Sequence, residues 1–277
     1  MKPAPFAYLR PETVEGAVAA LAEHDGAAVL AGGQSLVPML HMRLMRPDAV
    51  IDINRIAELD RIEVSGDTIA IGALTRYSAI EASPLVSERL PLLQNIVHYV
   101  GDRQIRNRGT IGGALAQADP VGEIPLACLA LDATVVLRSA SGTRELSVDE
   151  FLLGPYTTAR EPDELLVEVR FPESPGRCTF FELGRRHNDF AVLAVAAAGD
   201  READGSWQNL RVVLAGADYR ATRVNLDDSP LDDAAIDAAV ARCLDAIDPP
   251  DDVRASAEYR THLVGVHVAR VLSDLRA

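Results

Sequence analysis

The chain has 277 residues, 48% of them hydrophobic, 25% charged and 5% aromatic, a composition typical of globular proteins with a sizeable core. Asp and Glu number 41 against 27 Lys and Arg, and the formal charge of −14 argues against nucleic acid as a partner. The three cysteines lie far apart and form neither a disulfide framework nor a CxxC metal or cluster motif. Without an apolar signal segment or an apolar run long enough to span a membrane, we expect a cytoplasmic protein with no membrane insertion.

Apolar periodicity predicts alternating helices and strands in the first half of the chain. The first elements are a helix over 11–24, a strand over 27–31, a glycine turn, a helix over 35–44 and a strand over 49–53. The alternating pattern over 62–74 predicts a hairpin around Ser65-Gly66-Asp67. The next elements are a helix over 84–100, a loop rich in Gly and Arg over 101–113, a helix over 120–131 and a strand over 134–138.

The second half predicts a separate unit. A strand over 165–171 ends at Pro172, and the break in composition at Glu173-Ser174-Pro175-Gly176 places a domain boundary there, dividing residues 1–172 from 173–277. The later elements are strands over 178–183, 191–198 and 210–215 and helices over 232–246 and 253–275. The acidic residues Asp227, Asp228, Asp232 and Asp233 are interpreted as a solvated turn and helix start.

Several common catalytic motifs are absent from the sequence. It contains no GxGxxG, GxxxxGK[ST], HExxH, EF-hand or GxSxG pattern. The six histidines have no companions at metal-ligand spacing, and we interpret His262 and His267 as surface or packing residues.

Two glycine clusters remain as candidates for ligand binding, over 31–35 (AGGQS) and 110–114 (TIGGA). A glycine pair adopts positive φ easily and lets the backbone approach a ligand, and consecutive N–H groups in such a turn form an anion site. Both clusters therefore suit a diphosphate. A tight strand-to-helix turn is the alternative for either cluster alone.

Charged residues flank the second cluster. Arg103, Arg106 and Arg108 either orient an anionic cofactor or dock an acidic partner, or they belong to a solvated loop. Asp119 is an N-cap candidate beside Pro120. Glu123 either accepts hydrogen bonds from a ribityl or ribose hydroxyl or provides a favourable charge near a helix start.

A third unusual stretch, GRRHNDFA over 184–191, lies between two predicted strands. Its Phe190 is a core residue unless a ring system lies nearby, in which case it offers a flat face to a flavin or nucleobase. Spacing alone thus indicates a nucleotide or dinucleotide site.

The segments AGGQSLVPMLHMRLMRPDAVIDI (31–53) and QIRNRGTIGGALAQADPVGEIP (104–125) resemble the FAD-binding medium subunit of molybdenum hydroxylases, the carbon monoxide dehydrogenase and xanthine dehydrogenase family. The resemblance covers essentially the whole chain. It implies an α+β fold: a two-lobed FAD-binding domain of the vanillyl-alcohol-oxidase (PCMH) type, with lobes about 1–56 and 57–172, then a small α+β C-terminal domain.

The same resemblance assigns residues to FAD. Residues 31–35 and 110–114 would hold the diphosphate, Glu123 would contact ribityl or phosphate-side hydroxyls, and Phe190 would pack by the flavin ring. The full set is Leu30, Ala31, Gly32, Gly33, Gln34, Ser35, Leu36, Val100, Arg108, Gly109, Thr110, Ile111, Gly112, Gly113, Ala114, Ala118, Asp119, Glu123, Glu182 and Phe190. Three of these depart from the family pattern: Gln34 replaces a frequent His, Thr or Asn, Ala114 a common Asn, and Glu182 a usual Lys, so flavin tuning is expected to differ.

Without cysteine sets for iron–sulfur clusters or room for a molybdopterin domain, the chain alone cannot hydroxylate a substrate. The resemblance implies a small subunit with 2Fe–2S clusters, a large molybdopterin subunit, an external electron acceptor and a dimer of heterotrimers. FAD would be the only cofactor of this chain. Two alternatives are a stand-alone FAD oxidase or dehydrogenase, with His187 as the nearby base, and a non-enzymatic scaffold or sensor.

Overall fold

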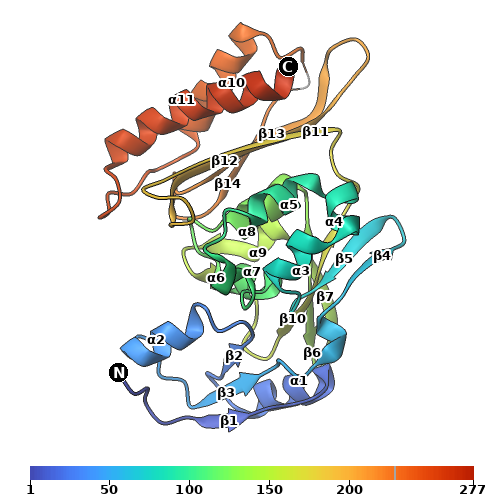
Figure 1. The fold of residues 1–277 in the computed structure, drawn as a ribbon, viewed down its shortest axis with the longest axis vertical. Helices are drawn as coiled ribbons and strands as arrows, with labels where there is room; N and C mark the ends of the chain where they lie inside the picture. Colours follow the sequence, from blue (N-terminus) through green and yellow to red (C-terminus); the bar gives the residue numbers. More distant parts are fainter. Residues whose placement is uncertain (228) are drawn as a thin grey trace.

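The computed structural model describes residues 1–227 and 229–277, which form three tiers stacked along the long axis of the molecule, with the two termini in opposite end tiers (Figure 1). Asp228, one of the four residues interpreted as a solvated acidic stretch, lies outside the described residues. The outer tiers are the N-terminal lobe and the C-terminal unit, and the second lobe lies between them.

The N-terminal lobe contains a parallel sheet in the order β1-β3-β2 (Ala7–Leu9, Ala49–Asp52, Ala28–Leu30). Helix α1 (Val14–Glu23) is capped by Thr13, whose side chain accepts a hydrogen bond from the Gly16 N–H group. Its buried face packs with β3 in a small core. Helix α2 (Leu36–Met42) follows the first glycine cluster, which confirms the predicted order of strand, glycine turn, helix and strand.

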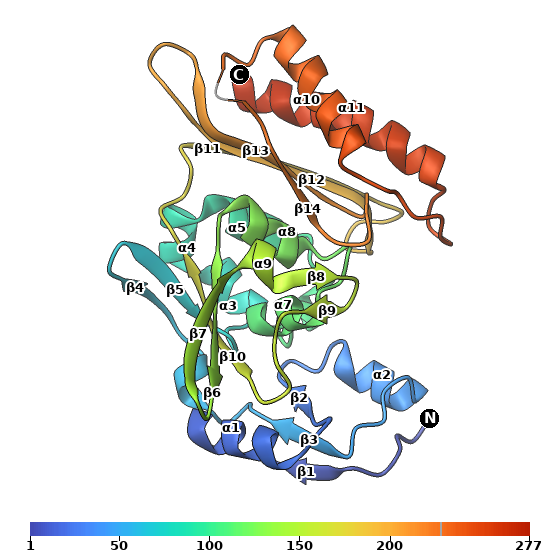
Figure 2. The same ribbon diagram turned by 180° about the vertical axis from the view of Figure 1, so that it is seen from behind.

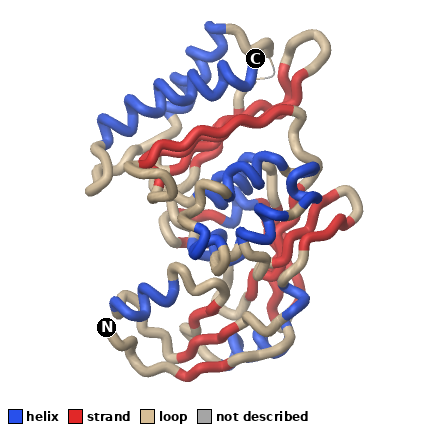
Figure 3. Tube along the Cα trace, viewed as in Figure 1, coloured by secondary structure: helices blue, strands red, loops and turns tan. Residues whose placement is uncertain are grey.

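The middle tier is built on an antiparallel sheet in the order β4-β5-β10-β6-β7 (Ile62–Ser65, Thr68–Gly72, Leu165–Phe171, Thr134–Ser139, Gly142–Ser147). The predicted hairpin at 62–74 is confirmed, with Gly66 at φ +60 in its turn. The other elements of this tier are η1 (Ala57–Leu59), α3 (Tyr77–Ala82), α4 (Pro84–Arg89), α5 (Pro91–Val97), α6 (Arg103–Arg106), α7 (Ile111–Gln117), α8 (Glu123–Ala130), α9 (Val148–Phe151), β8 (Leu152–Gly154) and β9 (Thr157–Thr158). Figure 3 shows the helices gathered on one side of this sheet.

Two predicted elements of this tier were wrong in detail. The single helix over 84–100 is two helices, because Pro91 lacks an N–H group and forces Leu90 out of the helical region before starting α5. The loop over 101–113 contains the one-turn helix α6, whose N-cap Asp102 accepts a hydrogen bond from Ile105, and the start of α7.

The C-terminal tier is an antiparallel sheet in the order β11-β12-β13-β14 (Arg177–Gly184, Ala191–Arg201, Trp207–Ala215, Thr222–Asn225). Helices α10 (Asp233–Asp245) and α11 (Ala257–Arg276) cover its outer face, and α5 and α8 of the middle tier lie against its inner face (Figure 2). The C-terminal helix begins at Ala257 and not at Val253, because Asp252 accepts hydrogen bonds from the N–H groups of Arg254 and Ala255 and holds them in a turn. Asp232 is the N-cap of α10, which confirms the predicted helix start there.

Within the described ranges, no helix has the length and apolarity needed to cross a membrane.

Candidate functional site

A cavity of about 760 Å³ lies where the three tiers meet. Its walls come from the loop after β2, from the start of α7 and α8, and from the loop after β11. The residues expected to bind a cofactor that line it are Ala31, Gly32, Gly33, Gln34, Ser35, Leu36, Val100, Gly109, Thr110, Gly112, Gly113, Ala114, Asp119, Glu123 and Phe190. Leu30, Arg108, Ile111, Ala118 and Glu182 do not line it, and Ile111 and Ala118 are buried in the core.

The first glycine cluster presents free donors. Gly33 has φ +76, a conformation that suits glycine, and directs the chain from β2 into α2. Across the residues that the structure describes, the N–H groups of Gly33, Gln34 and Ser35 have no hydrogen-bond acceptor. Three consecutive free N–H groups beside a cavity can hold the oxygens of an anion.

The second cluster differs from the first, against the prediction that both act in the same way. The N–H groups of Ile111, Gly112 and Gly113 donate to Thr75 O, Ala73 O and Thr110 Oγ1. A Cβ atom on Gly112 would lie 2.5 Å from that of Ala73. These glycines therefore let α7 pack tightly on the segment after β5, and most of their donors are already used.

The two clusters contact each other. A Cβ atom on Gly32 would lie 2.3 Å from the carbonyl oxygen of Arg108. Asn54 donates to Ala31 O at 2.8 Å, and Arg76 donates both to Asn54 Oδ1 and to Arg108 O. Asn54 and Arg76 thus tie both loops together, a role that no sequence pattern signalled.

The acidic wall of the cavity corrects one prediction. Asp119 is not the N-cap of α8: its side chain accepts a hydrogen bond from Val121, and Gly122 occupies the cap. Glu123 is the first residue of the helix, and burial followed by the charge of Asp119 raises its pKa to about 7. Burial also raises the pKa of Asp119.

The third stretch closes one side of the cavity. Phe190 is not a core residue, since 57% of it is exposed, and the Arg254 guanidinium lies 4.7 Å from its ring centroid. Arg185 donates to the carbonyl oxygens of Val253 and Arg254, so this loop is attached to the turn before α11. His187 lines the cavity, and its ring lies edge-on to that of Tyr99 with centroids 6.1 Å apart. Its imidazole forms no hydrogen bond with any described residue, so no hydrogen-bond partner prepares it as a catalytic base.

The arginines over 103–108 separate into two kinds. Arg106 pairs with Glu81 at 3.2 Å and donates to Gly101 O, which makes it a structural residue. Arg103 and Arg108 are exposed, and neither side chain lines the cavity.

Two buried acceptors lack partners, and one of them belongs to Asn188, which lines the cavity. Glu182 Oε2 and Asn188 Oδ1 are shielded from solvent and accept no hydrogen bond. A buried polar atom without a partner lowers stability. The free N–H groups of the first loop suit an anionic diphosphate, and the free acceptor on another wall suits a hydrogen-bond donor of the same ligand. FAD fits this set.

These features are those of a protein that can hold FAD between two lobes, and the family comparison says to which class it belongs. Residues 4–174 match the family described as "FAD binding domain in molybdopterin dehydrogenase", and residues 179–275 match "CO dehydrogenase flavoprotein C-terminal domain". The chain belongs to this family and is an oxidoreductase flavoprotein subunit, as the sequence predicted.

Relatives extend over the whole chain. It is 39% identical to the 6-hydroxypseudooxynicotine dehydrogenase complex subunit alpha of Paenarthrobacter nicotinovorans, covering 99% of this chain and 95% of that one. It is 37% identical to the carbon monoxide dehydrogenase medium chain of Hydrogenophaga pseudoflava, covering 99% and 98%. A solved structure of carbon monoxide dehydrogenase from H. pseudoflava superposes with a TM-score of 0.94 at 36% identity, covering 99% of this chain and 98% of that one.

Proposed function

We propose that this chain holds FAD in the cavity between its tiers and passes electrons from iron–sulfur clusters of a small partner subunit to an external acceptor. A large molybdopterin subunit would supply the electrons from its substrate, and the assembly would be a dimer of heterotrimers in the cytoplasm. The free N–H groups of Gly33, Gln34 and Ser35 beside the 760 Å³ cavity are the observation that carries the FAD assignment.

Each wall of the cavity has a distinct role in this proposal. The first loop binds the diphosphate, Glu123 faces the hydroxyl-rich part of the cofactor, and Phe190 covers the ring system. FAD supplies the redox chemistry when bound, and the chain positions it and sets the polarity around it. We keep the boundary between residues 172 and 173 as part of the same proposal.

Spectra test this proposal. The chain expressed alone should show flavin absorbance, and the chain purified with its native partners should show flavin together with iron and molybdenum. Absence of flavin from both preparations would overturn the proposal. The stand-alone oxidase has less support because His187 lacks a hydrogen-bond partner among the described residues. Turnover of a small molecule by the isolated chain would favour it.

A further inference from the structure

One cationic side chain belongs to the walls of the cavity. Among the described residues that line it, Arg160 is the only Lys or Arg, and it lies in the loop between β9 and β10. The carboxyl groups on the same walls belong to Asp102, Asp119, Glu123, Glu164 and Asp189. Because acidic walls repel the anionic diphosphate of a dinucleotide, a cation among them is needed to offset that repulsion.

Contacts within its own loop fix the Arg160 side chain. Its Nη1 donates to the carbonyl oxygens of Glu161 at 2.9 Å, Pro162 at 3.3 Å and Glu164 at 2.7 Å. The Glu161 N–H group donates to Glu164 Oε2 at 2.8 Å, which closes the same loop on itself. A guanidinium that is already held in place loses little freedom when a ligand binds.

The charge of Arg160 has no carboxylate partner. Glu164 is paired with Arg144, whose Nε and Nη2 donate to its two carboxylate oxygens at 2.9 and 2.7 Å. Across the described residues, Arg160 forms no ion pair, and its Nε and Nη2 donate to no acceptor. Burial lowers the pKa of Arg160, because less water surrounds the guanidinium charge. A fixed cation with free donors on a cavity wall suits an anionic ligand.

The packing of β10 places this loop beside the first glycine cluster. Leu165, the first residue of β10, is buried in the core of the N-terminal lobe, against which Ala31 packs. Arg160 is anchored on the carbonyl group of Glu164, the residue directly before Leu165. Figure 2 shows the chain between β9 and β10 passing next to β2, which leads into the first glycine cluster. Arg160 and the free N–H groups of residues 33–35 therefore line the cavity from adjacent segments.

We propose that Arg160 binds the diphosphate of the cofactor and supplies the positive charge that the first glycine cluster lacks. The inference rests on the proposed function, because it needs FAD in this cavity. The N–H groups of residues 33–35 hold phosphate oxygens, and Nε and Nη2 of Arg160 add charge-assisted hydrogen bonds to them. The side chains of Arg76 and Arg254 contact other groups of the protein and do not line the cavity.

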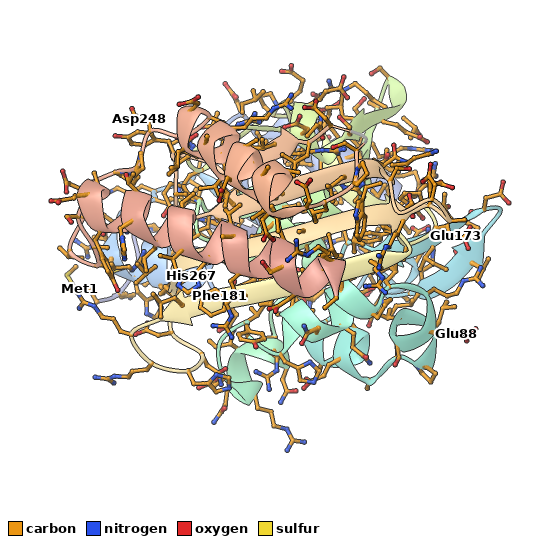
Figure 4. All side chains as sticks on the ribbon, turned by 90° about the horizontal axis from the view of Figure 1, so that it is seen from above. Met1, Glu88, Glu173, Phe181, Asp248 and His267 are labelled. Carbon is orange, nitrogen blue, oxygen red and sulfur yellow. The ribbon has the colours of Figure 1, made fainter. Side chains whose placement is uncertain are left out.

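Titration of the apo full chain with FAD tests this role. Loss of a charge-assisted contact to phosphate should weaken FAD binding about ten- to hundredfold in R160Q. R160K keeps the positive charge and should bind FAD more tightly than R160Q. The matched control, Arg89→Gln, should keep the wild-type affinity, since Arg89 is exposed and follows Glu88, which lies at the outer edge of the molecule (Figure 4). Wild-type affinity in R160Q, or equal losses in R160Q and R160K, would overturn the proposal.

A second measurement uses the wild-type chain and needs no variant. Phenylglyoxal modifies accessible arginine side chains, and peptide mapping by mass spectrometry identifies each modified residue. We expect Arg160 to react in the apo chain and to be protected by FAD and by inorganic pyrophosphate, while Arg89 reacts equally in every sample. No reaction of Arg160 in the apo chain, or no protection by pyrophosphate, would overturn the diphosphate contact while leaving FAD binding intact. Failure of the wild-type chain to bind FAD would instead overturn the proposed function and this inference with it.

Discussion

Gly32 and Arg108 meet backbone to backbone, so that a Cβ atom on Gly32 would come within 2.3 Å of the Arg108 carbonyl oxygen. This contact joins the N-terminal lobe to the middle tier at the edge of the cavity. Glycine is therefore needed at position 32 because a side chain there has no room. Position 33 needs glycine for a different reason, since its backbone has a positive φ.

Replacing Gly32 by alanine should therefore separate the two loops. Overpacking of this kind costs about 1–3 kcal/mol, and we expect FAD affinity to fall by about tenfold or more because the free N–H groups move with the loop. Titration of the apo chain with FAD measures the change. The control is Gly265→Ala on α11, where a Cβ atom would meet nothing within 4 Å, and FAD affinity in that variant should stay at the wild-type value.

Asn54 provides a second way to loosen the same contact. Its amide donates to Ala31 O and its Oδ1 accepts from Arg76, so Asn54→Ala leaves Ala31 O unpaired and leaves Arg76 with its bond to Arg108 O alone. We expect a loss of about 1–3 kcal/mol in the free energy of unfolding and weaker FAD binding. Asn107→Ala, at an exposed position, is the control for denaturant unfolding, and an equal effect in the two variants would contradict a bridging role for Asn54.

The sequence predicted the order of the main elements because their apolar periodicity is strong. Strand 165–171 and the hairpin at 62–74 agree with the structure almost to the residue. The sequence did not predict the short strands β1, β8 and β9 or the edge strands β7 and β14. In β7 and β14, the polar sequences GTRELS and TRVN carry little periodic signal. Residue spacing also cannot predict contacts between residues far apart in the chain, such as the hydrogen bond between Asn54 and Arg76.

The predicted site shows the same limit. Glycine patterns located both loops, but only the hydrogen bonds reveal that the first has free donors while the second uses its own for packing. Phe190 was predicted as core unless a ring system lay nearby, because an aromatic residue between two strands usually packs inward. Phe190 instead lies exposed at the wall of the cavity, with the Arg254 guanidinium over its ring.

Glu182 should make the stability of the apo chain depend on pH. Burial, and then the charge of Glu123, raises its folded-state pKa to about 8, above the ordinary value of 4.5, so the folded state favours the protonated form. The resulting stability is fully present below the ordinary pKa and is lost as pH rises through the folded-state pKa. Glu182→Gln should match the wild-type protein in acid and unfold at higher urea concentration than the wild type above about pH 8. If the free energies of unfolding of the wild-type protein and Glu182→Gln differ by a constant amount from acid pH to above about pH 8, Glu182 does not titrate as described.

His267 should act in the opposite direction on the outer face of the same sheet. Its Nδ1 is buried without a partner, its ring stacks on Phe181, and burial followed by the charges of Arg270 and His262 lowers its pKa below 6.5. The folded state therefore disfavours the imidazolium, and the stability present above the ordinary pKa is lost as pH falls below it. His267→Phe keeps a stacked ring and removes the titration, so its free energy of unfolding should exceed that of the wild-type protein increasingly between about pH 7 and pH 5. His41→Phe, at an exposed position, controls for the loss of a histidine. A similar pH trend in that variant would show that the effect comes from the loss of any histidine charge and not from the buried ring stacked on Phe181.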